Sequence, residues 1–387
     1  MALKEILLTP GPSQVPHRVR AKLMEQAWYH RSTRFREIYA QVRQRLQQVF
    51  ETKNDVLVFT GSGTVAMEAA IINVVSPGRK AVVVSAGKWG ERLVQICEQY
   101  KLGLDVLKLD YGRSPTPEQV AERAKDPAVQ AVYLHLCETS TGAKYDIENI
   151  GKAVRKVNPE ALYGVDGISG AIGMACPVDA WGVDLFMAGS QKGLMMPPGL
   201  SMLSVSPRAW KVVEQNKGAP TYYSSLLRAR KGLPENDPPF TPANTLFDAQ
   251  NEALAMLVEE GIHNVHKRHA VLAQATRAAV KALGLELFPD SPAEVLTVVK
   301  SPDGLDSSAV IKTARDRYGV TLANGQGEMK CKMFRIAHMG YCSGMDTLSG
   351  IAALELGLKA NGYGVKLGAG LAAAQDVLAQ APKEVLL

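Results

Sequence analysis

The sequence predicts an α/β fold, with a large domain built on a mostly parallel sheet and a smaller C-terminal α+β domain. Two observations support this class. Between residues 56 and 204, short continuous apolar runs alternate with segments of helical periodicity, as in sheets covered on both faces. Around residues 215–245 this alternation stops in a proline-rich loop, and the strands and helices that follow keep a different order.

The length of 387 residues also favours two domains over one core. Residues 1–16 are predicted to form an extended N-terminal arm, because the prolines within Thr9-Pro-Gly-Pro12 and Val15-Pro16 interrupt helices. We assign residues 17–260 to the large domain and residues 261–387 to the small one.

The elements of the large domain follow from its apolar pattern. Residues 18–50 are predicted to be helical, because apolar side chains recur at helical spacing toward Phe50. A strand over 56–59 precedes a glycine-containing loop and a helix over 65–72. The pattern further predicts strands over 81–85, 105–109, 131–136, 162–165, 185–187 and 200–204, and a helix over 91–100.

After the proline-rich loop, a long helix is predicted from about residue 246 into the 260s and beyond, and the small domain follows. Apolar runs predict strands over 285–288, 295–299, 320–323 and 333–337. Helical periodicity predicts helices over 307–317, 346–360 and 369–380.

The charge and cysteine content exclude several classes of protein. The net charge is 44 − 38 = +6, and the basic residues are scattered, so no nucleic-acid or membrane surface is predicted. No apolar stretch approaches the roughly 18 residues of a membrane span, and the N-terminus is too short and charged for a signal peptide. The five dispersed cysteines form no Cys-x-x-Cys pair, which favours a reducing cytoplasm without disulfides or structural zinc.

No metal site is predicted either. His263, His266 and His269 recur at every third position, but the spacing lacks the paired histidines and glutamate of the zinc motif. We expect an exposed helix face there.

One lysine is the strongest chemical signal. An apolar run that predicts a buried strand ends at Gly189-Ser-Gln191. Lys192 follows directly after this strand end, among apolar or small neighbours. Burial of that kind lowers the pKa of an amine and makes it nucleophilic. A second buried strand ends in Asp166. An amine and a carboxylate at such positions suit pyridoxal phosphate (PLP), since the amine forms a Schiff base and the carboxylate keeps the pyridine nitrogen protonated. Asp166 would equally serve as a helix cap.

A second signal is the loop Gly61-Ser-Gly-Thr64 between a strand and a helix. Small residues before a helix N-terminus suit a phosphate, although a tight turn with a capping hydroxyl is an equal reading. Gly61, Gly63 and Ala66 also fit the dinucleotide fingerprint. The next strand ends in Ser85-Ala-Gly87, without the carboxylate that this fingerprint needs, so a nicotinamide cofactor is disfavoured.

Two further residues have both a functional and a structural interpretation. Trp89 follows a strand end, where an aromatic ring either stacks on a flat cofactor or belongs to the core. Arg335 lies inside an apolar strand and needs an anionic partner, either a substrate carboxylate or a structural ion pair.

With these residues assembled, the chain resembles the class V (fold type I) PLP-dependent aminotransferases, and within them the alanine/serine–glyoxylate aminotransferase branch. The likeness runs over nearly the whole length. Its motifs are Leu8-Thr-Pro-Gly-Pro12, His30-Arg-Ser32, Gly61-Ser-Gly-Thr64, Glu138-Thr-Ser-Thr-Gly142, Val165-Asp166, Gly189-Ser-Gln-Lys192 with Pro197-Pro-Gly199, Phe240-Thr-Pro242 and Phe334-Arg-Ile-Ala-His338.

The resemblance implies a fold type I PLP-binding large domain and a role for each matched residue. Lys192 would form the Schiff base and move the proton, and Asp166 would pair with the pyridine nitrogen. Trp89 would stack on the ring, and Thr139 would lie near its 3-hydroxyl. Arg335 would bind the substrate α-carboxylate. The resemblance also implies a set of phosphate-binding residues, namely Ser62, Gly63, Thr64, Gln191 and the partner subunit's Thr241, so that the active site would require a homodimer.

The implied reaction is ping-pong transfer of the amino group of serine, alanine or aspartate to glyoxylate or pyruvate. Two alternatives stay open, a PLP-dependent lyase of the cysteine desulfurase type and an aminotransferase for an aminophosphonate. Desulfurase-type relatives carry a histidine before the lysine and a histidine as the stacking residue. Gln191 and Trp89 occupy these positions here, which favours transamination.

Overall fold

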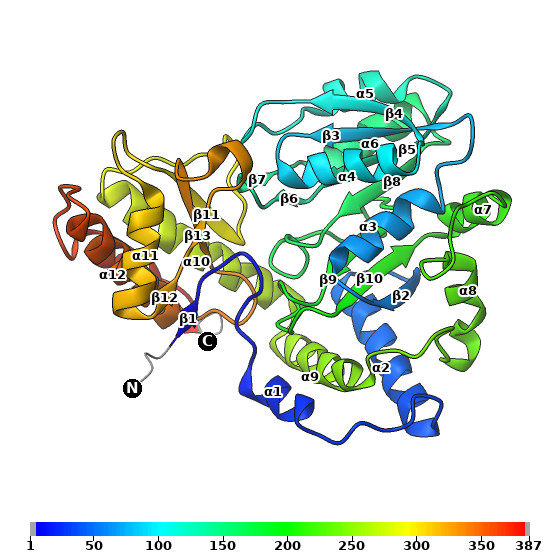
Figure 1. Ribbon diagram of the computed structural model, residues 1–387, viewed down its shortest axis with the longest axis horizontal. Coiled ribbons are helices and arrows are strands. Elements are labelled where there is room, and N and C mark those ends of the chain that lie inside the picture. The colour runs from blue at the N-terminus through cyan, green and yellow to red at the C-terminus, as the bar shows by residue number, and fades with distance from the viewer. Residues whose placement is uncertain (1–4, 384–387) are drawn as a thin grey trace.

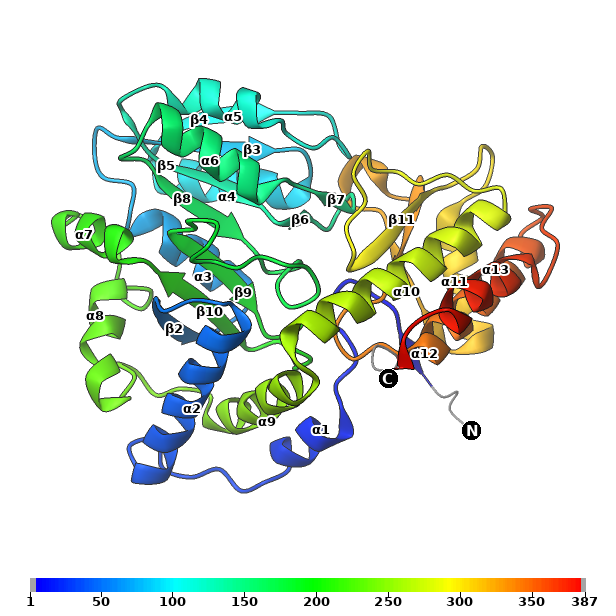
Figure 2. The ribbon, with the colours of Figure 1, turned by 180° about the vertical axis from the view of Figure 1, so that it is seen from behind.

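The computed structural model describes residues 5–383, which form a large and a small lobe (Figures 1 and 2). A seven-stranded sheet organises the large lobe, in the order β2-β10-β9-β8-β5-β3-β4. Only β10 runs antiparallel to its neighbours, so the predicted α/β fold with a mostly parallel sheet is confirmed. The strands are β2 (Asp55–Thr60), β3 (Lys80–Ser85), β4 (Gly103–Lys108), β5 (Val129–His135), β8 (Leu162–Asp166), β9 (Leu185–Gly189) and β10 (Leu200–Val205).

Helices cover both faces of this sheet, which explains why its strands are apolar without alternation. Helices α3 and α4 lie on the face turned to the viewer in Figure 1, and α6 lies on the opposite face, in front in Figure 2. Every residue of β8, β9 and β10 is buried. The helices of this lobe are α1 (His17–Leu23), α2 (Thr33–Val49), α3 (Gly63–Ile72), α4 (Lys88–Gln99), α5 (Pro117–Ala124), α6 (Ile147–Val157), α7 (Pro207–Gln215), α8 (Leu226–Lys231), the 3-10 turn η1 (Leu233–Glu235) and α9 (Asn244–Glu260).

The small lobe combines an antiparallel sheet, in the order β11-β14-β13, with helices packed on it. Helix α10 runs from the base of the large lobe into the small one (Figure 2). Its Val265 belongs to the large core, whereas Leu272 belongs to the small core. The domain boundary at residue 260 stays a prediction. The elements are α10 (Ile262–Ala282), β11 (Leu296–Lys300), α11 (Ser307–Tyr318), β12 (Val320–Thr321), β13 (Ala323–Asn324), the 3-10 turn η2 (Gly327–Met329), β14 (Met333–Ala337), α12 (Gly344–Ala360) and α13 (Ala369–Ala379).

The N-terminal arm connects the two lobes. Its strand β1 (Ile6–Leu7) pairs in parallel with β12 of the small lobe, and Leu8 is buried in the small core. The arm then passes between the lobes to α1, which packs beside α9 (Figure 1). The predicted arm covers residues 1–16, of which residues 1–4 lie outside the described residues.

Four predicted elements differ from the structure. The helical region 18–50 is two helices. The Ser32 side chain accepts a hydrogen bond from the Phe35 N–H and is the N-cap at which α2 begins. The long helix breaks at Gly261, where φ is +80°.

The other two differences concern strands. Residues 285–288 form no strand, since only a single bridge joins Leu287 to Val299. The run 320–323 divides into β12 and β13, which pair in different sheets. Local apolar content cannot distinguish these outcomes, because strand pairing depends on distant segments.

No helix within residues 5–383 is long and apolar enough to cross a lipid bilayer.

Candidate active site

A cavity of about 570 Å³ lies where the large lobe, the small lobe and the N-terminal arm meet. The carboxyl ends of β2, β8 and β9 open into it, as expected for a parallel sheet. Nine of the ten residues predicted to form the site line this cavity, namely Ser62, Gly63, Thr64, Trp89, Thr139, Asp166, Gln191, Lys192 and Arg335.

Lys192 lines this cavity and is buried, with 8% of its surface exposed. Its Nζ donates a hydrogen bond to the carbonyl oxygen of Pro10 in the arm. Gly11 lies beside it with φ of +117°, a backbone conformation that favours glycine, and a Cβ at that position would lie 2.6 Å from Nζ. Burial, and next the positive charge of Arg335, lower the pKa of Lys192 from 10.5 to about 8. The expected shift toward a nucleophilic amine is therefore present.

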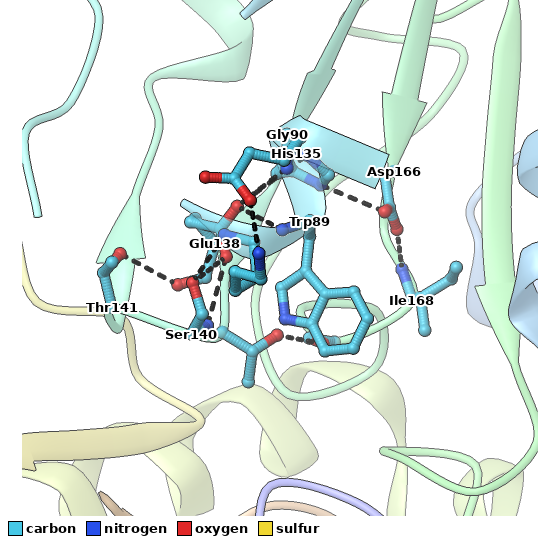
Figure 3. Close-up of polar contacts among 12 residues, drawn as sticks. Trp89, Gly90, His135, Glu138, Ser140, Thr141, Asp166 and Ile168 are labelled. Carbon is cyan, nitrogen blue, oxygen red and sulfur yellow. Dashed lines mark hydrogen bonds and ion pairs between the residues drawn. The ribbon is translucent and has the colours of Figure 1, made fainter. Parts of the chain in front are cut away.

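Asp166 ends β8 and is also nearly fully buried. Its Oδ1 accepts a hydrogen bond from the Ile168 N–H at 2.8 Å, which closes a turn. No helix lies between β8 and β9 in the described residues, so the expectation of a helix cap at Asp166 is wrong. Its Oδ2 lies 3.0 Å from Nδ1 of His135, as Figure 3 shows. Burial lowers the pKa of His135, but the charge and hydrogen bond of Asp166 outweigh burial, and the pKa is raised above 6.5. His135 thus lies behind Asp166, on the side away from the cavity, and fixes the position of its carboxylate.

Glu138 holds the first turn of α4, which carries Trp89 (Figure 3). Its carboxylate is fully buried and accepts hydrogen bonds from the backbone N–H groups of Trp89 at 3.1 Å and Gly90 at 3.0 Å. The N–H and hydroxyl of Ser140 donate to the other oxygen. The α4 N-cap Gly87 has no side chain, so Glu138 supplies the missing helix cap. Trp89 is thereby fixed with its ring on the cavity wall and not in the core.

The N-terminus of α3 forms the next part of the wall. Ser62 is the N-cap, but its side chain caps no N–H, which leaves the first donors of the helix available. Gly63 packs closely against Ile168, since a Cβ at this position would lie 2.6 Å from Cδ1 of Ile168, and the side chain of Ile168 would have to move. Gln191 reaches the same wall from the end of β9, and its Oε1 is buried without a hydrogen-bond partner among residues 5–383. The uncapped N–H groups at the start of α3 are donors, and they favour an anion site over a simple capped turn.

Arg335 enters the cavity from β14 of the small lobe. It donates hydrogen bonds to the carbonyl oxygens of Asn324 at 2.8 Å and Thr139 at 3.2 Å. No carboxylate of residues 5–383 lies within ion-pair distance of its guanidinium, which disfavours the structural ion pair. Burial lowers the pKa of Arg335 to about 10. A buried arginine without an anion is suited to bind one.

The structure places two residues elsewhere than the sequence predicted. Thr241 does not line this cavity and lies in a separate surface depression with Tyr223 and Phe240. Its role in a partner subunit stays a prediction. The expectation of an exposed histidine face is wrong for His269, which is fully buried and accepts a hydrogen bond from the Gly340 N–H at 3.0 Å.

The sequence interpretation did not include several cavity or support residues, among them Arg92, His135, Glu138 and Ser169. His135 and Glu138 carry a signal that was available, because they stand at the end of a predicted buried strand, where polar residues need a partner. Ser169 hydrogen-bonds Thr139 across the cavity wall. Arg92 follows Trp89 by three residues, and no sequence pattern marks it.

Comparison with known proteins agrees with this site. Residues 6–343 match the family model described as aminotransferase class-V. A serine–glyoxylate aminotransferase of Methylorubrum extorquens is 36% identical over 97% of this chain and 96% of its own. A Synechococcus protein named as the small subunit of a soluble hydrogenase is 38% identical over 98% of this chain and 99% of its own.

A solved structure is similar to this chain in both fold and sequence. Pyridoxamine–pyruvate aminotransferase from Mesorhizobium loti superposes with a TM-score of 0.93 at 30% identity, over 98% of each chain. The similarity spans both lobes and the arm, and it confirms the family that the motifs predicted. The chain belongs to the class-V aminotransferase family, whose members are generally PLP-dependent.

Proposed function

We propose that this protein is a PLP-dependent aminotransferase that moves the amino group of a small amino acid (serine, alanine or aspartate) to glyoxylate or pyruvate. The observation that carries the proposal is the buried amine of Lys192. Burial lowers its pKa to about 8, and it faces the cavity that Asp166 and Arg335 also line. These three side chains supply an amine, a carboxylate and a carboxylate-binding cation.

The donors and acceptors of the cavity fit PLP. The uncapped start of α3, with Ser62, Gly63 and Thr64, would hold the phosphate together with Gln191. Asp166, with His135 behind it, would pair with the pyridine nitrogen. Trp89 would stack on the ring, and the hydroxyl pair of Thr139 and Ser169 would lie near the 3-hydroxyl. The cavity of about 570 Å³ falls in the ordinary range for small-molecule sites.

When bound, PLP supplies an electron-withdrawing ring for the amino acid. The residues of the chain would transfer the proton, pair with the ring and orient the donor. With a pKa of about 8, Lys192 is partly a free amine near neutral pH, so it can take the Cα proton of the donor and return it. Asp166 would keep a proton on the ring nitrogen, and Arg335 would orient the donor through its α-carboxylate. The arm residues Pro10 and Gly11 line the same cavity and would exclude water.

The desulfurase-type lyase finds no support in the cavity. Cys331, the cysteine nearest in sequence to Arg335, does not line it and instead contacts the Ser308 hydroxyl at 3.1 Å. Cys137 does line it, but burial raises the pKa of this thiol well above 9.0. A thiol of that kind is a poor nucleophile. No observation favours an aminophosphonate over an α-amino acid.

Two measurements test the proposal. Lys192→Ala should abolish turnover and the absorbance band of the bound cofactor, and full activity of this variant would overturn the assignment. A screen of serine, alanine, aspartate and an aminophosphonate against glyoxylate and pyruvate would identify the donor and acceptor. Release of sulfide from cysteine without amino transfer would instead support the lyase.

The active site is further proposed to require a homodimer. Thr241 and Phe240 lie beside the exposed aromatic residues Tyr222 and Tyr223, which are 68% and 43% exposed and suit an interface. The test mixes two inactive variants, Lys192→Ala and Thr241→Glu. If sites are shared, mixed dimers regain one intact site and part of the activity. Activity that stays absent in mixed dimers would refute sharing.

A cytoplasmic location stays part of the proposal. It is supported by the five free cysteines, four of which are buried.

A further inference from the structure

The cavity carries more positive charge than the roles assigned above account for. Three cationic side chains line it, namely Lys192, Arg335 and Arg92, against the single carboxylate of Asp166. Under the proposed function, Arg335 binds the substrate carboxylate and Asp166 the ring nitrogen. The cofactor phosphate carries close to two negative charges at neutral pH, and the residues assigned to it above are all neutral. One cation is therefore unassigned, and one dianion has no charged partner.

Arg92 lies at the place where that dianion would bind. It occupies the second turn of α4 and donates a hydrogen bond from Nη1 to Oγ1 of Thr64 at 3.3 Å. Thr64 belongs to the first turn of α3, the predicted phosphate site. The Arg92 guanidinium carbon also lies 4.4 Å from the centre of the Trp89 ring, which holds the group by a cation–π contact.

The remaining donors of Arg92 are available. A guanidinium has five N–H groups, and only the bond to Thr64 is made within residues 5–383. No carboxylate of these residues lies within ion-pair distance of it. Planar donors held on two sides and facing a cavity are suited to a phosphate.

We propose that Arg92 is a cofactor-binding residue that supplies the counter-charge of the PLP phosphate, acting with Thr64 at the start of α3. This inference rests on the proposed function, because it assigns a residue to the cofactor of that reaction. It concerns the phosphate alone, so it predicts a difference between PLP and pyridoxal, which lacks the phosphate.

The test measures equilibrium binding of PLP and of pyridoxal to the cofactor-free protein by tryptophan fluorescence. Arg92→Met should weaken PLP binding by about 10- to 100-fold, as expected for the loss of hydrogen bonds to a charged group. Pyridoxal binding should change by less than about threefold, because the ring contacts remain. Arg123→Met is the matched control, since Arg123 pairs with Asp105 on the surface and should alter neither affinity.

The outcomes separate the two proposals. A wild-type protein that binds neither PLP nor pyridoxal would refute the proposed function. A wild-type protein that binds PLP, with Arg92→Met binding it equally well, would overturn the role of Arg92 alone. Equal losses for PLP and pyridoxal, or an altered KM for aspartate with unchanged PLP affinity, would also overturn it.

If Arg92→Met does not fold, Arg92→Lys retains the charge and tests the same idea. It should bind PLP about 3- to 10-fold more weakly than the wild type, with pyridoxal unchanged, because lysine lacks the planar donor fork. Equal weakening of both ligands would again overturn the inference.

Discussion

The buried amine of Lys192 should destabilise the cofactor-free protein, and Lys192→Met should relieve that destabilisation. The folded protein holds the pKa of Lys192 near 8, against 10.5 for the exposed group. At 1.36 kcal/mol for each pH unit, this difference corresponds to about 3 kcal/mol against the folded state at pH 7. The variant also leaves the Pro10 carbonyl without its hydrogen bond, at a cost of about 1 kcal/mol, so the net gain is about 2 kcal/mol.

The sign of the pH dependence makes the prediction specific. Because the folded pKa lies below the unfolded one, the unfolded chain binds more protons between pH 8 and 10.5. The wild type therefore gains stability as the pH rises through this window, and the advantage of Lys192→Met shrinks. At pH 10 the wild-type penalty should fall to about 1 kcal/mol.

The assay is urea unfolding of both cofactor-free proteins at pH 7 and pH 10, followed by circular dichroism. Lys217→Met, at an exposed lysine, is the control and should change the free energy of unfolding by less than about 0.5 kcal/mol. A Lys192→Met advantage that is the same at both pH values would refute the reasoning, as would a variant less stable than the wild type at pH 7.

Three further changes should have distinct effects. Glu138→Ala leaves the N–H groups of Trp89, Gly90 and Ser140 without an acceptor and should lower the free energy of unfolding by about 3 kcal/mol or more, measured by urea unfolding; a loss under about 1 kcal/mol would contradict the capping role. His135→Asn should lower the free energy of unfolding more at pH 6 than at pH 9. Because the pKa of His135 is raised in the folded protein, its protonated form stabilises the fold, and this contribution is lost as the pH rises through the folded pKa. A loss that does not depend on pH, measured by urea unfolding, would argue against a protonated His135. Arg335→Gln should lower kcat/KM for the amino donor by about 10- to 100-fold while PLP affinity is unchanged, and an unaltered kcat/KM in steady-state assays would remove Arg335 from the substrate site.

The strands and most helices were predictable because their signals are local. The strands that became β2, β3, β8 and β9 are short apolar runs bounded by polar or small residues. Burial on both faces removes the alternation of an exposed strand, but runs of five or six residues are too short for a typical helix. The errors arose where a distant segment decides the outcome. Residues 320–323 divide into two strands because the arm pairs with one half and β14 with the other.

By itself, the sequence determined which residues end the buried strands, and it thereby placed Lys192, Asp166 and the Gly61 loop at one edge of the sheet. It also determined the family through the order of its motifs. Only the tertiary structure decided what surrounds these groups. The arm carbonyl that contacts Lys192 is 182 residues away, and Glu138 reaches the start of α4 across 49 residues. Such contacts depend on how lobes and loops pack, and no local periodicity encodes them. The protonation of Lys192 and His135 follows from that packing, because burial and neighbouring charges set a pKa.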